Sequence, residues 1–404
     1  MVDFDTVVIG AGASGLAFAL ASIRKGARVM VLEQRSHLGG LGATREVKLP
    51  DGKSFPFDVH GGHVFNAQDP EVRDWAFRSL PKAEWLEHKR TSAALLPDGT
   101  WVDYPVERNG IDWKMFSPLG DYDVDSAGDY GKGLLSEYGE VAQRYLLHYD
   151  SKMWGSALPS LAPVFRPSTM PRSTPGARDG AHTHSTFYYP KVGGYGTVFK
   201  AIAGQVALWN QAAIRTMAEV TAIVPFSKWL DVCVKDYGTL SCRRVLYTGA
   251  LTRLPRLLDY ASIPEMDLQA APLTCVLTND SELCSLAKGK SWVYLPGKTY
   301  SGSLDCLNHF HKLDNVGLMA GRDGEVVSLV ATKRGIGPVP GELDREEIDH
   351  AYPLPTKARA GVVVGAQAAL AKLNIHLVGR LATWQHITVD RCIREALDLS
   401  RSFE

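Results

Sequence analysis

Cysteine is scarce in this sequence, and no two cysteines form a short C-x-x-C pair. The spacing argues against a zinc ribbon or a redox dithiol, and reduced thiols are the expectation for a cytosolic protein. No metal site is expected. The six residues are Cys233, Cys242, Cys275, Cys284, Cys306 and Cys392.

An excess of charge of one sign is also missing. The 44 Lys and Arg residues equal the 44 Asp and Glu residues, so the net charge is zero. No overall field therefore favours nucleic acid or an acidic membrane surface, and neither is expected as a partner. Local arginines or backbone amides would have to hold any anionic ligand.

Long apolar runs are absent too. The stretch Leu16 to Ile23 is far shorter than the ~20 residues that span a bilayer. The first residues pass straight into a strand-like segment, without the basic region and cleavage site of a signal peptide. We expect a soluble, cytoplasmic protein, and the 404 residues favour more than one domain.

The first forty residues carry a clear pattern of strand, glycine-rich turn, helix, strand and acid. A β-branched run ends at Ile9, and the turn G-A-G-A-S-G follows over 10–15. The second strand ends at Glu33, about twenty residues past the turn, as in dinucleotide-binding folds. In such folds the first glycine permits the turn, the second admits a pyrophosphate, and the third lets helix and strand pack closely. The predicted glycines are Gly10, Gly12 and Gly15.

This unit alone would suit NAD as well as FAD. The helix amides and its dipole would meet the phosphates, and Glu33 would accept hydrogen bonds from ribose hydroxyls. The continuation "EQRSHLGG" over 33–40 resembles flavoproteins of the glutathione-reductase and amine-oxidase type, and this resemblance favours FAD. It implies that Arg35, Gly39 and Gly40 border the pyrophosphate and the flavin ring.

Several later motifs resemble one family, the flavin-dependent UDP-galactopyranose mutases. The matches are "GGHVFN" over 61–66, "YDSKMWG" over 149–155, "VGGY" over 192–195, "YTG" over 247–249, Tyr352-Pro353 and "GRLA" over 379–382. Their order and spacing extend from residue 3 to about residue 398. The chain is thus similar to a divergent member of that family over nearly its whole length.

The resemblance implies an α/β fold with a Rossmann-like FAD-binding domain, a small helical insertion and an antiparallel β-sheet domain. We expect the FAD-binding domain over 1–80, 193–252 and 350–404. A mostly helical insertion is expected over 81–150. The substrate domain is expected over 151–192 and 253–349.

The family chemistry interconverts the pyranose and furanose forms of a nucleotide-diphosphate sugar without net oxidation. The resemblance implies that N5 of reduced FAD attacks the anomeric carbon as a covalent nucleophile and displaces the nucleoside diphosphate. The alternative from the same framework is an FAD-dependent amine or alcohol oxidase. A third possibility is a nonenzymatic FAD-carrying protein. The sequence leaves the oligomeric state open, with a homodimer under consideration.

Carried onto this sequence, the family pattern assigns candidate residues to each role. The predicted catalytic residues are His63, Arg166, Tyr352 and His386. The predicted substrate-binding residues are Tyr145, Tyr149, Trp154, Arg166, Arg172, Tyr189, Tyr352 and His386. The predicted cofactor-binding residues are Gly10, Gly12, Ser14, Gly15, Glu33, Arg35, Gly39, Gly40, Leu41, His63, Val64, Val220, Gly249, Arg380, Thr388 and Val389.

The sequence departs from the family where the nucleotide and sugar would bind. The resemblance implies that Arg166 or Arg172 supplies the first diphosphate-binding arginine. A second is expected near 300–308, but "TYSGSLDCLNHFHKLD" over 299–314 contains none. His309 or Lys312 would be the substitutes, although neither offers a bidentate fork. A phosphate-contacting tyrosine of the family is His386 here, and an acid near the ribityl chain is Thr388. Losing one charged hydrogen bond costs roughly 1.5–3 kcal/mol, so a changed substrate or changed chemistry is expected.

The pair His60 and His63 in "DVHGGHVFNAQ" over 58–68 raises a choice between a metal site, a tight core turn and contact with a flat cofactor. No cluster of acids or cysteines supports a metal. The resemblance implies that the backbone of Gly61 and Gly62 lies against the flavin and that His63 faces it near N5. His60 is expected to be structural.

Overall fold

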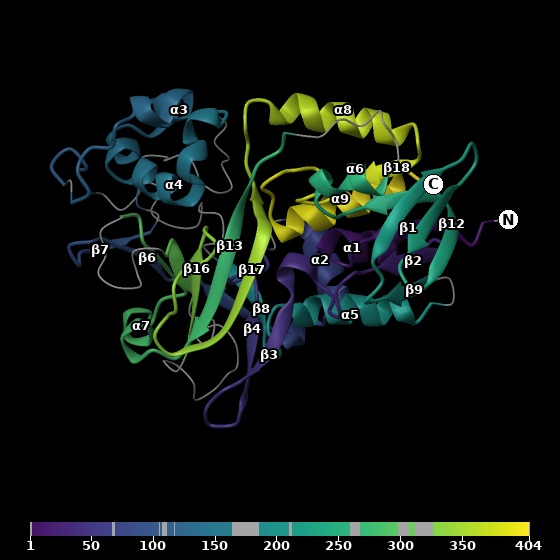
Figure 1. Ribbon diagram of the computed structural model, residues 1–404. Coiled ribbons are helices and arrows are strands. Elements are labelled where there is room, and N and C mark those ends of the chain that lie inside the picture. Colours follow the sequence, from purple (N-terminus) through teal and green to yellow (C-terminus); the bar gives the residue numbers. More distant parts are fainter. Residues whose placement is uncertain are drawn as a thin grey trace.

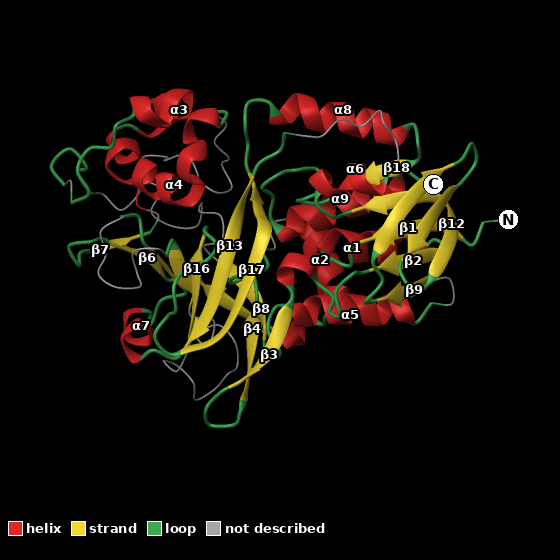
Figure 2. Cartoon of the chain, in the orientation of Figure 1, coloured by secondary structure: helices red, strands yellow, loops and turns green. Residues whose placement is uncertain are grey.

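The computed structural model describes residues 2–66, 69–104, 106, 111–116, 118–163, 186–209, 212–258, 267–297, 307–311 and 326–403. Two β-sheets dominate this part of the chain, and helices surround the first of them (Figures 1 and 2). No helix among these residues combines the length and the apolar character that a membrane crossing needs.

The first sheet has the strand order β10-β11-β12-β1-β2-β9, and β18 pairs with the end of β12. The pairs β12–β1, β1–β2, β2–β9 and β12–β18 are parallel, whereas β10, β11 and the start of β12 form an antiparallel meander. Its strands are β1 (Phe4–Ile9), β2 (Val29–Leu32), β9 (Ala212–Arg215), β10 (Val220–Pro225), β11 (Leu230–Val234), β12 (Gly238–Tyr247) and β18 (Ile375–Leu377).

Both faces of this sheet are covered, because successive side chains of a strand point to opposite sides. Val8 and Val31 pack with the helices α1, α2, α5 and α9, while Val7 and Met30 pack with α6 and α8 on the other face. These helices are α1 (Ala13–Ile23), α2 (Pro70–Ser79), α5 (Gly196–Ala207), α6 (Leu254–Leu257), α8 (Arg359–Ala371) and α9 (Val389–Arg401). Figure 1 shows α8 and α5 on opposite sides of the sheet.

The second sheet has the order β17-β13-β16-β15-β14-β6-β7 and is antiparallel except for the pair β14–β6. Its strands are β6 (Ser92–Leu95), β7 (Trp101–Asp103), β13 (Ala270–Thr278), β14 (Trp292–Tyr294), β15 (His309–His311), β16 (Val327–Ala331) and β17 (Glu342–Pro353). Two separate antiparallel pairs join β3 (Thr44–Lys48) to β4 (Ser54–Asp58) and β5 (Trp85–Lys89) to β8 (Thr186–Pro190).

A small helical group lies beside the second sheet and has its own core (Figure 2). It contains α3 (Gly128–Tyr138), a π-helical turn (Ala142–Leu146) and α4 (Leu147–Trp154), and α7 (Ser281–Leu286) lies on the second sheet. Single 3-10 turns cover Gly40–Gly42, Lys82–Glu84, Asp125–Ala127, Gly155–Ser160 and Leu251–Arg253.

The predicted fold class, a Rossmann-like domain with a helical insertion and an antiparallel sheet domain, is confirmed. The segment 81–150 differs from the expectation at its start, because β5, β6 and β7 occupy 85–103 and the first α-helix that the structure describes in it begins at Gly128. Strands β5 and β6 pair with β8 and β14, which lie far along the chain and which local sequence patterns do not reveal, and β7 pairs with β6. Strand β17 also runs past the expected boundary at residue 350.

Candidate functional site

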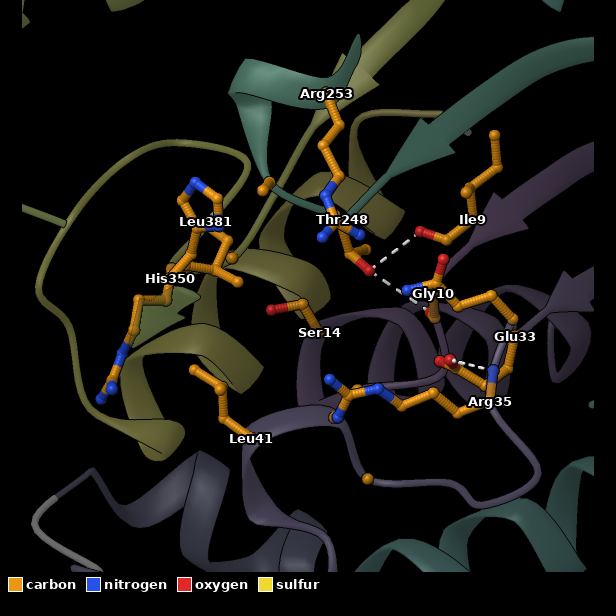
Figure 3. A pocket seen from close by; sticks show the side chains of 18 of the residues that line it. Ile9, Gly10, Ser14, Glu33, Arg35, Leu41, Thr248, Arg253, His350 and Leu381 are labelled. Carbon is orange, nitrogen blue, oxygen red and sulfur yellow. Dashed lines mark hydrogen bonds between the residues drawn. The ribbon is translucent and has the colours of Figure 1, made fainter. Parts of the chain in front are cut away.

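A cavity of about 610 Å³ opens at the carboxyl ends of β1, β2 and β12, where dinucleotides bind in folds of this kind (Figure 3). The first residues of α1 and α9 both line it, so two helix N-termini border the same space. Exposed backbone N–H groups at such ends attract phosphate. The cavity is thus suited to an anionic ligand.

The three glycines of the turn have the separate roles expected in a dinucleotide-binding fold. Gly10 has φ +107°, and a Cβ there would lie 2.2 Å from Thr248 Oγ1. A Cβ on Gly15 would lie 2.0 Å from the carbonyl oxygen of Gly10, so α1 can approach the turn only because this side chain is missing. At Gly12 the nearest protein atom to a Cβ would be 3.9 Å away. No protein atom therefore packs closely against the Cβ position of Gly12, and the open space beside it belongs to the cavity.

Glu33 lies at the end of β2 and is only 8% exposed. One carboxylate oxygen accepts the backbone N–H of Ala11 at 2.9 Å, and the other accepts the N–H of Arg35 at 3.0 Å. The acid therefore holds the glycine turn in place as well as bordering the cavity. In Figure 3, Arg35 enters from one wall and Arg253 from the opposite wall, towards Thr248.

Most predicted cofactor residues line the cavity. These are Gly10, Gly12, Ser14, Glu33, Arg35, Gly39, Gly40, Leu41, His63, Val220, Gly249, Arg380 and Val389. Gly15, Val64 and Thr388 do not line it: Gly15 packs under the turn, Val64 packs against the core, and Thr388 is the residue before α9. Their assigned roles in cofactor binding stay predictions.

Sequence reasoning missed several lining residues. Arg253 and Arg256 come from the turn and helix after β12, Arg334 from the turn after β16, and His350 from β17. Each lies in or just after a strand that the fold brings to the cavity from a distant part of the chain. Thr248 could have been predicted, since it precedes Gly249 in the "YTG" motif. Its hydroxyl donates to the carbonyl oxygen of Ile9 at 3.0 Å.

His63 lies in the cavity wall with Nδ1 2.9 Å from the carbonyl oxygen of Gly61. A carbonyl only accepts, so Nδ1 carries the proton and Nε2 keeps its lone pair. Burial, reinforced by the nearby Arg380, lowers the pKa of His63 to about 4. His60 is 4% exposed and donates from Nδ1 to Leu41 O at 3.1 Å. His63 thus bonds within its own loop, whereas His60 bonds to the turn at Gly40–Gly42.

Among the described residues, no group of three His, Cys, Asp or Glu side chains could hold a metal ion. His60 and His63 therefore gain no further ligands from this part of the chain.

Three predicted site residues from separate segments form an aromatic cluster. The rings of Trp154 and Tyr352 are 6.2 Å apart, those of Trp154 and His386 6.0 Å, and those of Tyr352 and His386 5.2 Å. All three are half-buried. The Arg380 guanidinium lies 6.0 Å from the Tyr352 ring centre and also lines the cavity. Arg380 therefore links the cluster to the dinucleotide cavity.

The remaining substrate candidates divide into two groups. Tyr149 is half-buried, packs edge-on to Tyr294 at 5.7 Å and forms a 3.2 Å hydrogen bond with Nδ1 of His309. Tyr145 is only 2% exposed and packs against Trp113 in the helical core, so its predicted contact with substrate is not evident in this structure.

Tyr189 also differs from its predicted role in substrate binding. Its side chain is 3% exposed, and its hydroxyl donates to Asp58 at 2.8 Å in the core of the molecule. This contact serves the fold, because it joins β8 to β4. Arg166, Arg172 and Lys312 lie outside the described residues.

Comparison with known proteins agrees with this architecture. The sequence pattern of the NAD(P)-binding Rossmann-like domain matches residues 8–78. A UDP-galactopyranose mutase of Mycoplasma pneumoniae is 33% identical over 72 residues, which are 18% of this chain and 17% of that protein. The sequence match to the curated relative thus spans under a fifth of its length.

Two solved structures share the fold over almost the full chain. A reduced UDP-galactopyranose mutase superposes with a TM-score of 0.76 at 17% identity and covers 100% of this chain and 94% of its own. A putrescine oxidase double mutant superposes with a TM-score of 0.64 at 14% identity and covers 99% and 98%.

Fold and cavity together define a protein with a Rossmann-like dinucleotide-binding domain and an antiparallel sheet domain, an architecture that the solved UDP-galactopyranose mutase and putrescine oxidase structures share. Within that class, the predicted resemblance to UDP-galactopyranose mutases is confirmed. The chain is similar in sequence to the Mycoplasma enzyme over that 72-residue segment, and its fold resembles that of the reduced mutase throughout.

Proposed function

We propose that this protein is a flavin-dependent mutase that interconverts the pyranose and furanose forms of a nucleotide-diphosphate sugar. The observation that carries the proposal is the cluster of Trp154, Tyr352 and His386, which Arg380 connects to the dinucleotide cavity. These residues come from three separate segments of the chain and were selected by family motifs alone. Their convergence beside the cavity supports a shared role.

The cofactor of the proposal is FAD. The cavity suits it because the turn around Gly12 leaves open space, Glu33 borders that space, and two helix N-termini meet there. Gly10, Gly12, Ser14, Gly39 and Gly40 would take the pyrophosphate, and Val220 and Gly249 would lie beside the adenosine. Bound in its reduced form, FAD would supply a nucleophilic N5 for attack on the anomeric carbon.

The protein would contribute binding, orientation and a fixed protonation state. His63 presents a neutral imidazole with Nδ1–H held by Gly61, so Nε2 would be available as a hydrogen-bond acceptor towards the reduced flavin or the sugar. Tyr352 and Trp154 would bind the sugar and diphosphate, and His386 would donate to a phosphate oxygen. Tyr149 would take the base. Arg166 and Arg172 stay candidates for the diphosphate clamp.

Turnover by the reduced protein tests this proposal. Dithionite-reduced, FAD-loaded protein would be mixed anaerobically with UDP-, GDP- and dTDP-sugars, and the products would be separated by ion-pair chromatography. We expect interconversion with at least one of them, and none with the oxidised protein. Absence of turnover with all three nucleotide classes would overturn the proposal.

A matched pair of variants sharpens the result. Tyr352→Ala removes a ring that contacts Trp154, His386 and Arg380, so we expect at least a tenfold loss in kcat/KM. Tyr237→Ala removes an exposed tyrosine in the turn between β11 and β12 and should leave turnover unchanged. Equal activity of the two variants would show that turnover does not need the aromatic cluster.

The second candidate function is that of an FAD-dependent amine or alcohol oxidase. It is favoured by the likeness of fold to putrescine oxidase, which covers nearly the whole of both chains. Under this alternative, oxidised protein in air would consume oxygen and release peroxide with amines or alcohols. The two functions are thus distinguished by the redox state in which the protein turns over.

A further inference from the structure

An arginine beside the second sheet is surrounded by aromatic rings. Arg90 lies between β5 and β6, and its guanidinium carbon is 4.8 Å from the centre of the Trp292 ring and 5.2 Å from that of Tyr104. Its Nε donates a hydrogen bond to Ser92 Oγ at 2.7 Å, and a terminal nitrogen donates to the Tyr294 hydroxyl. Two rings and two hydrogen bonds therefore hold the planar group in one orientation.

The described residues do not balance the positive charge of Arg90. No Asp or Glu side chain among them forms an ion pair with it, although the arginine is half-buried and has lost part of its hydration. A guanidinium has five N–H donors, and its bonds to Ser92 and Tyr294 use two of them. The other three have no partner in the described part of the chain. Arg90 is thus a fixed cation that can still hold an anionic ligand through parallel N–H groups.

Tyr294 connects Arg90 to the candidate substrate site. The Arg90 guanidinium lies 5.9 Å from the Tyr294 ring centre, and that ring lies 5.7 Å from the ring of Tyr149, so Arg90 and Tyr149 are less than about 12 Å apart. A nucleoside diphosphate stacked on Tyr149 can span this separation. Trp154, at the sugar end of the proposed site, follows five residues later on α4, which is about 7.5 Å along the helix. The diphosphate would lie between these two ends.

His309, which the sequence offered as a substitute for the missing arginine, belongs to the same group of side chains. Its Nδ1 is 3.2 Å from the Tyr149 hydroxyl, and its ring lies 6.0 Å from that of Tyr294. Burial, reinforced by the charge of Arg90, lowers the pKa of His309 to about 3. The imidazole is therefore neutral near pH 7 and offers a phosphate no positive charge. Arg90 carries the charge in this group.

We propose that Arg90 binds the diphosphate of the nucleotide sugar and supplies the second arginine that the segment 299–314 lacks. The proposal rests on the proposed function and adds to it a residue that no family motif indicated. Ser92 and Tyr294 orient the guanidinium, and phosphate oxygens approach its remaining N–H groups in the plane between the covering rings. The missing arginine then requires no change of substrate, because the charge comes from a different part of the chain.

Ligands that share a base but differ in phosphate test this role. The Kd for UDP would be measured by calorimetry on the FAD-loaded protein, and that for uridine by ligand-observed NMR, which detects weak binding. In Arg90→Met, which removes the charge but keeps an unbranched side chain, we expect the Kd for UDP to rise about ten- to a hundredfold, the usual worth of hydrogen bonds to a charged group. The Kd for uridine should stay within about twofold. Arg90→Lys keeps the charge without the fork, so a smaller rise for UDP, of more than about threefold, is expected.

Arg244→Met is the matched control. Arg244 is also half-buried and lies 4.3 Å from an aromatic ring, that of Phe403, but it belongs to β12 of the first sheet. Its replacement removes a charge and a cation–π contact of the same kind, away from Tyr149 and Tyr294, and should leave both affinities within about twofold of wild type. Urea unfolding and FAD content show which variants are folded.

The outcomes separate this role from the proposed function. A UDP affinity within about twofold of wild type in folded Arg90→Met overturns the role. Equal losses for uridine and UDP also overturn it, because they would indicate that the arginine only supports the fold. So does a wild-type protein that binds none of UDP, GDP and dTDP.

Turnover is judged apart from affinity. If Arg90→Met loses UDP affinity selectively while the reduced wild-type protein interconverts no nucleotide sugar, the proposed function fails and the diphosphate contact of Arg90 stands. Should Arg90→Met not fold, Arg90→Lys decides with the same two ligands: a loss for UDP alone supports the contact, and unchanged or equally weakened binding overturns it.

Discussion

At the scale of single residues, Gly12 and Gly15 share one turn but do different work. A methyl group on Gly15 would meet the Gly10 carbonyl oxygen at 2.0 Å, whereas one on Gly12 would meet no protein atom closer than 3.9 Å. Gly15 must lack a side chain for the chain to fold, whereas the missing side chain of Gly12 leaves room for a ligand in the cavity. Substitution of Gly15 should therefore lower stability, and substitution of Gly12 should weaken ligand binding.

Replacement of each glycine by alanine tests this division. Gly15→Ala should lower the free energy of unfolding of the FAD-free protein by about 1–3 kcal/mol, the usual cost of overpacking. Gly12→Ala should leave that stability within about 0.5 kcal/mol but raise the Kd for FAD at least tenfold. Urea unfolding and fluorescence titration measure the two quantities.

Gly26→Ala is no neutral control, because Gly26 has φ +86°. The exposed Gly204→Ala, with nothing near its Cβ, serves instead. Unaltered FAD affinity in Gly12→Ala would contradict the assignment.

His63 gives the second prediction at this scale. Its pKa is depressed to about 4, so the folded protein binds fewer protons here than the unfolded chain between about pH 4 and 6.5. The contribution of His63 to stability is thus present above pH 6.5 and is lost as the pH falls through about 4. The imidazole should therefore stay neutral between about pH 5.5 and 8.

NMR titration of the His63 ring protons should accordingly show no inflection between pH 5.5 and 8. His63→Ala should leave FAD bound and impair turnover by about 10²-fold or more, the usual contribution of a positioned acid–base group. His376→Ala, a half-buried histidine on β18 beside Phe403, is the matched control. Full activity in His63→Ala would remove the histidine from the mechanism.

The sequence predicts those residues of the site whose neighbours in space are also neighbours in the chain. Gly10, Gly12 and Glu33 belong to one local unit, and the unit lies as expected. Arg253 and His350 were not predicted, because the pairing of distant strands brings them to the cavity. Tyr189 shows the opposite case: the family pattern assigned it to the substrate, but its hydroxyl donates to Asp58, 131 residues away, and the contact is part of the core.

At the scale of secondary-structure elements, Asp58 joins four of them. It ends β4, accepts from Thr44 of β3 at 2.5 Å and from Tyr189 of β8 at 2.8 Å, and takes the backbone N–H of Tyr195 before α5 at 3.0 Å. Despite these donors, burial raises its pKa to about 6. The same carboxyl group therefore connects the elements and carries a cost when it ionises.

That cost gives a pH-dependent prediction. The raised pKa means that the folded state binds more protons here than the unfolded chain between about pH 4 and 6, so this group's contribution to stability is lost as the pH rises. A shift of two units corresponds to about 3 kcal/mol. Asp58→Asn keeps the acceptor for Thr44 and Tyr195 and cannot ionise. The stability of Asp58→Asn relative to wild type should increase by about 2–3 kcal/mol between pH 4 and 7.

Urea unfolding at each pH measures the difference. Asp98→Asn, in an exposed turn, provides the comparison for a carboxylate that joins no elements. A flat difference curve for Asp58→Asn would contradict the role of burial.

Elements with strong local periodicity, such as α1 and α9, follow from the sequence. The strands β6 and β7 do not, because they are four and three residues long. Strand β6 pairs with β14, about 200 residues away, and β7 pairs with β6, so both depend on that distant partner rather than on their own composition.

At the scale of the whole molecule, the cavity joins the two sheets. Its walls include Ile9 and Tyr247 from the first sheet and Ile348 and His350 from β17 of the second. A ligand that fills it contacts residues from the N-terminal turn to the last helix. Binding should therefore stabilise the two sheets together rather than one local unit.

The last prediction follows from that arrangement. A ligand that binds only the folded state stabilises it by RT ln(1 + [L]/Kd), about 2.7 kcal/mol at one hundred times Kd. FAD at this excess should raise the temperature of a single cooperative unfolding transition seen by calorimetry. FMN at the same concentration should raise it far less, because FMN has no adenosine to reach Val220 and Gly249 and only one phosphate for the two helix N-termini. In Gly12→Ala the FAD effect should shrink while the FAD-free transition stays in place.

Equal stabilisation by FMN and FAD would mean that the adenosine half of the cavity is not used. Two transitions, with FAD moving only one, would mean that the sheets unfold independently despite the wall they share.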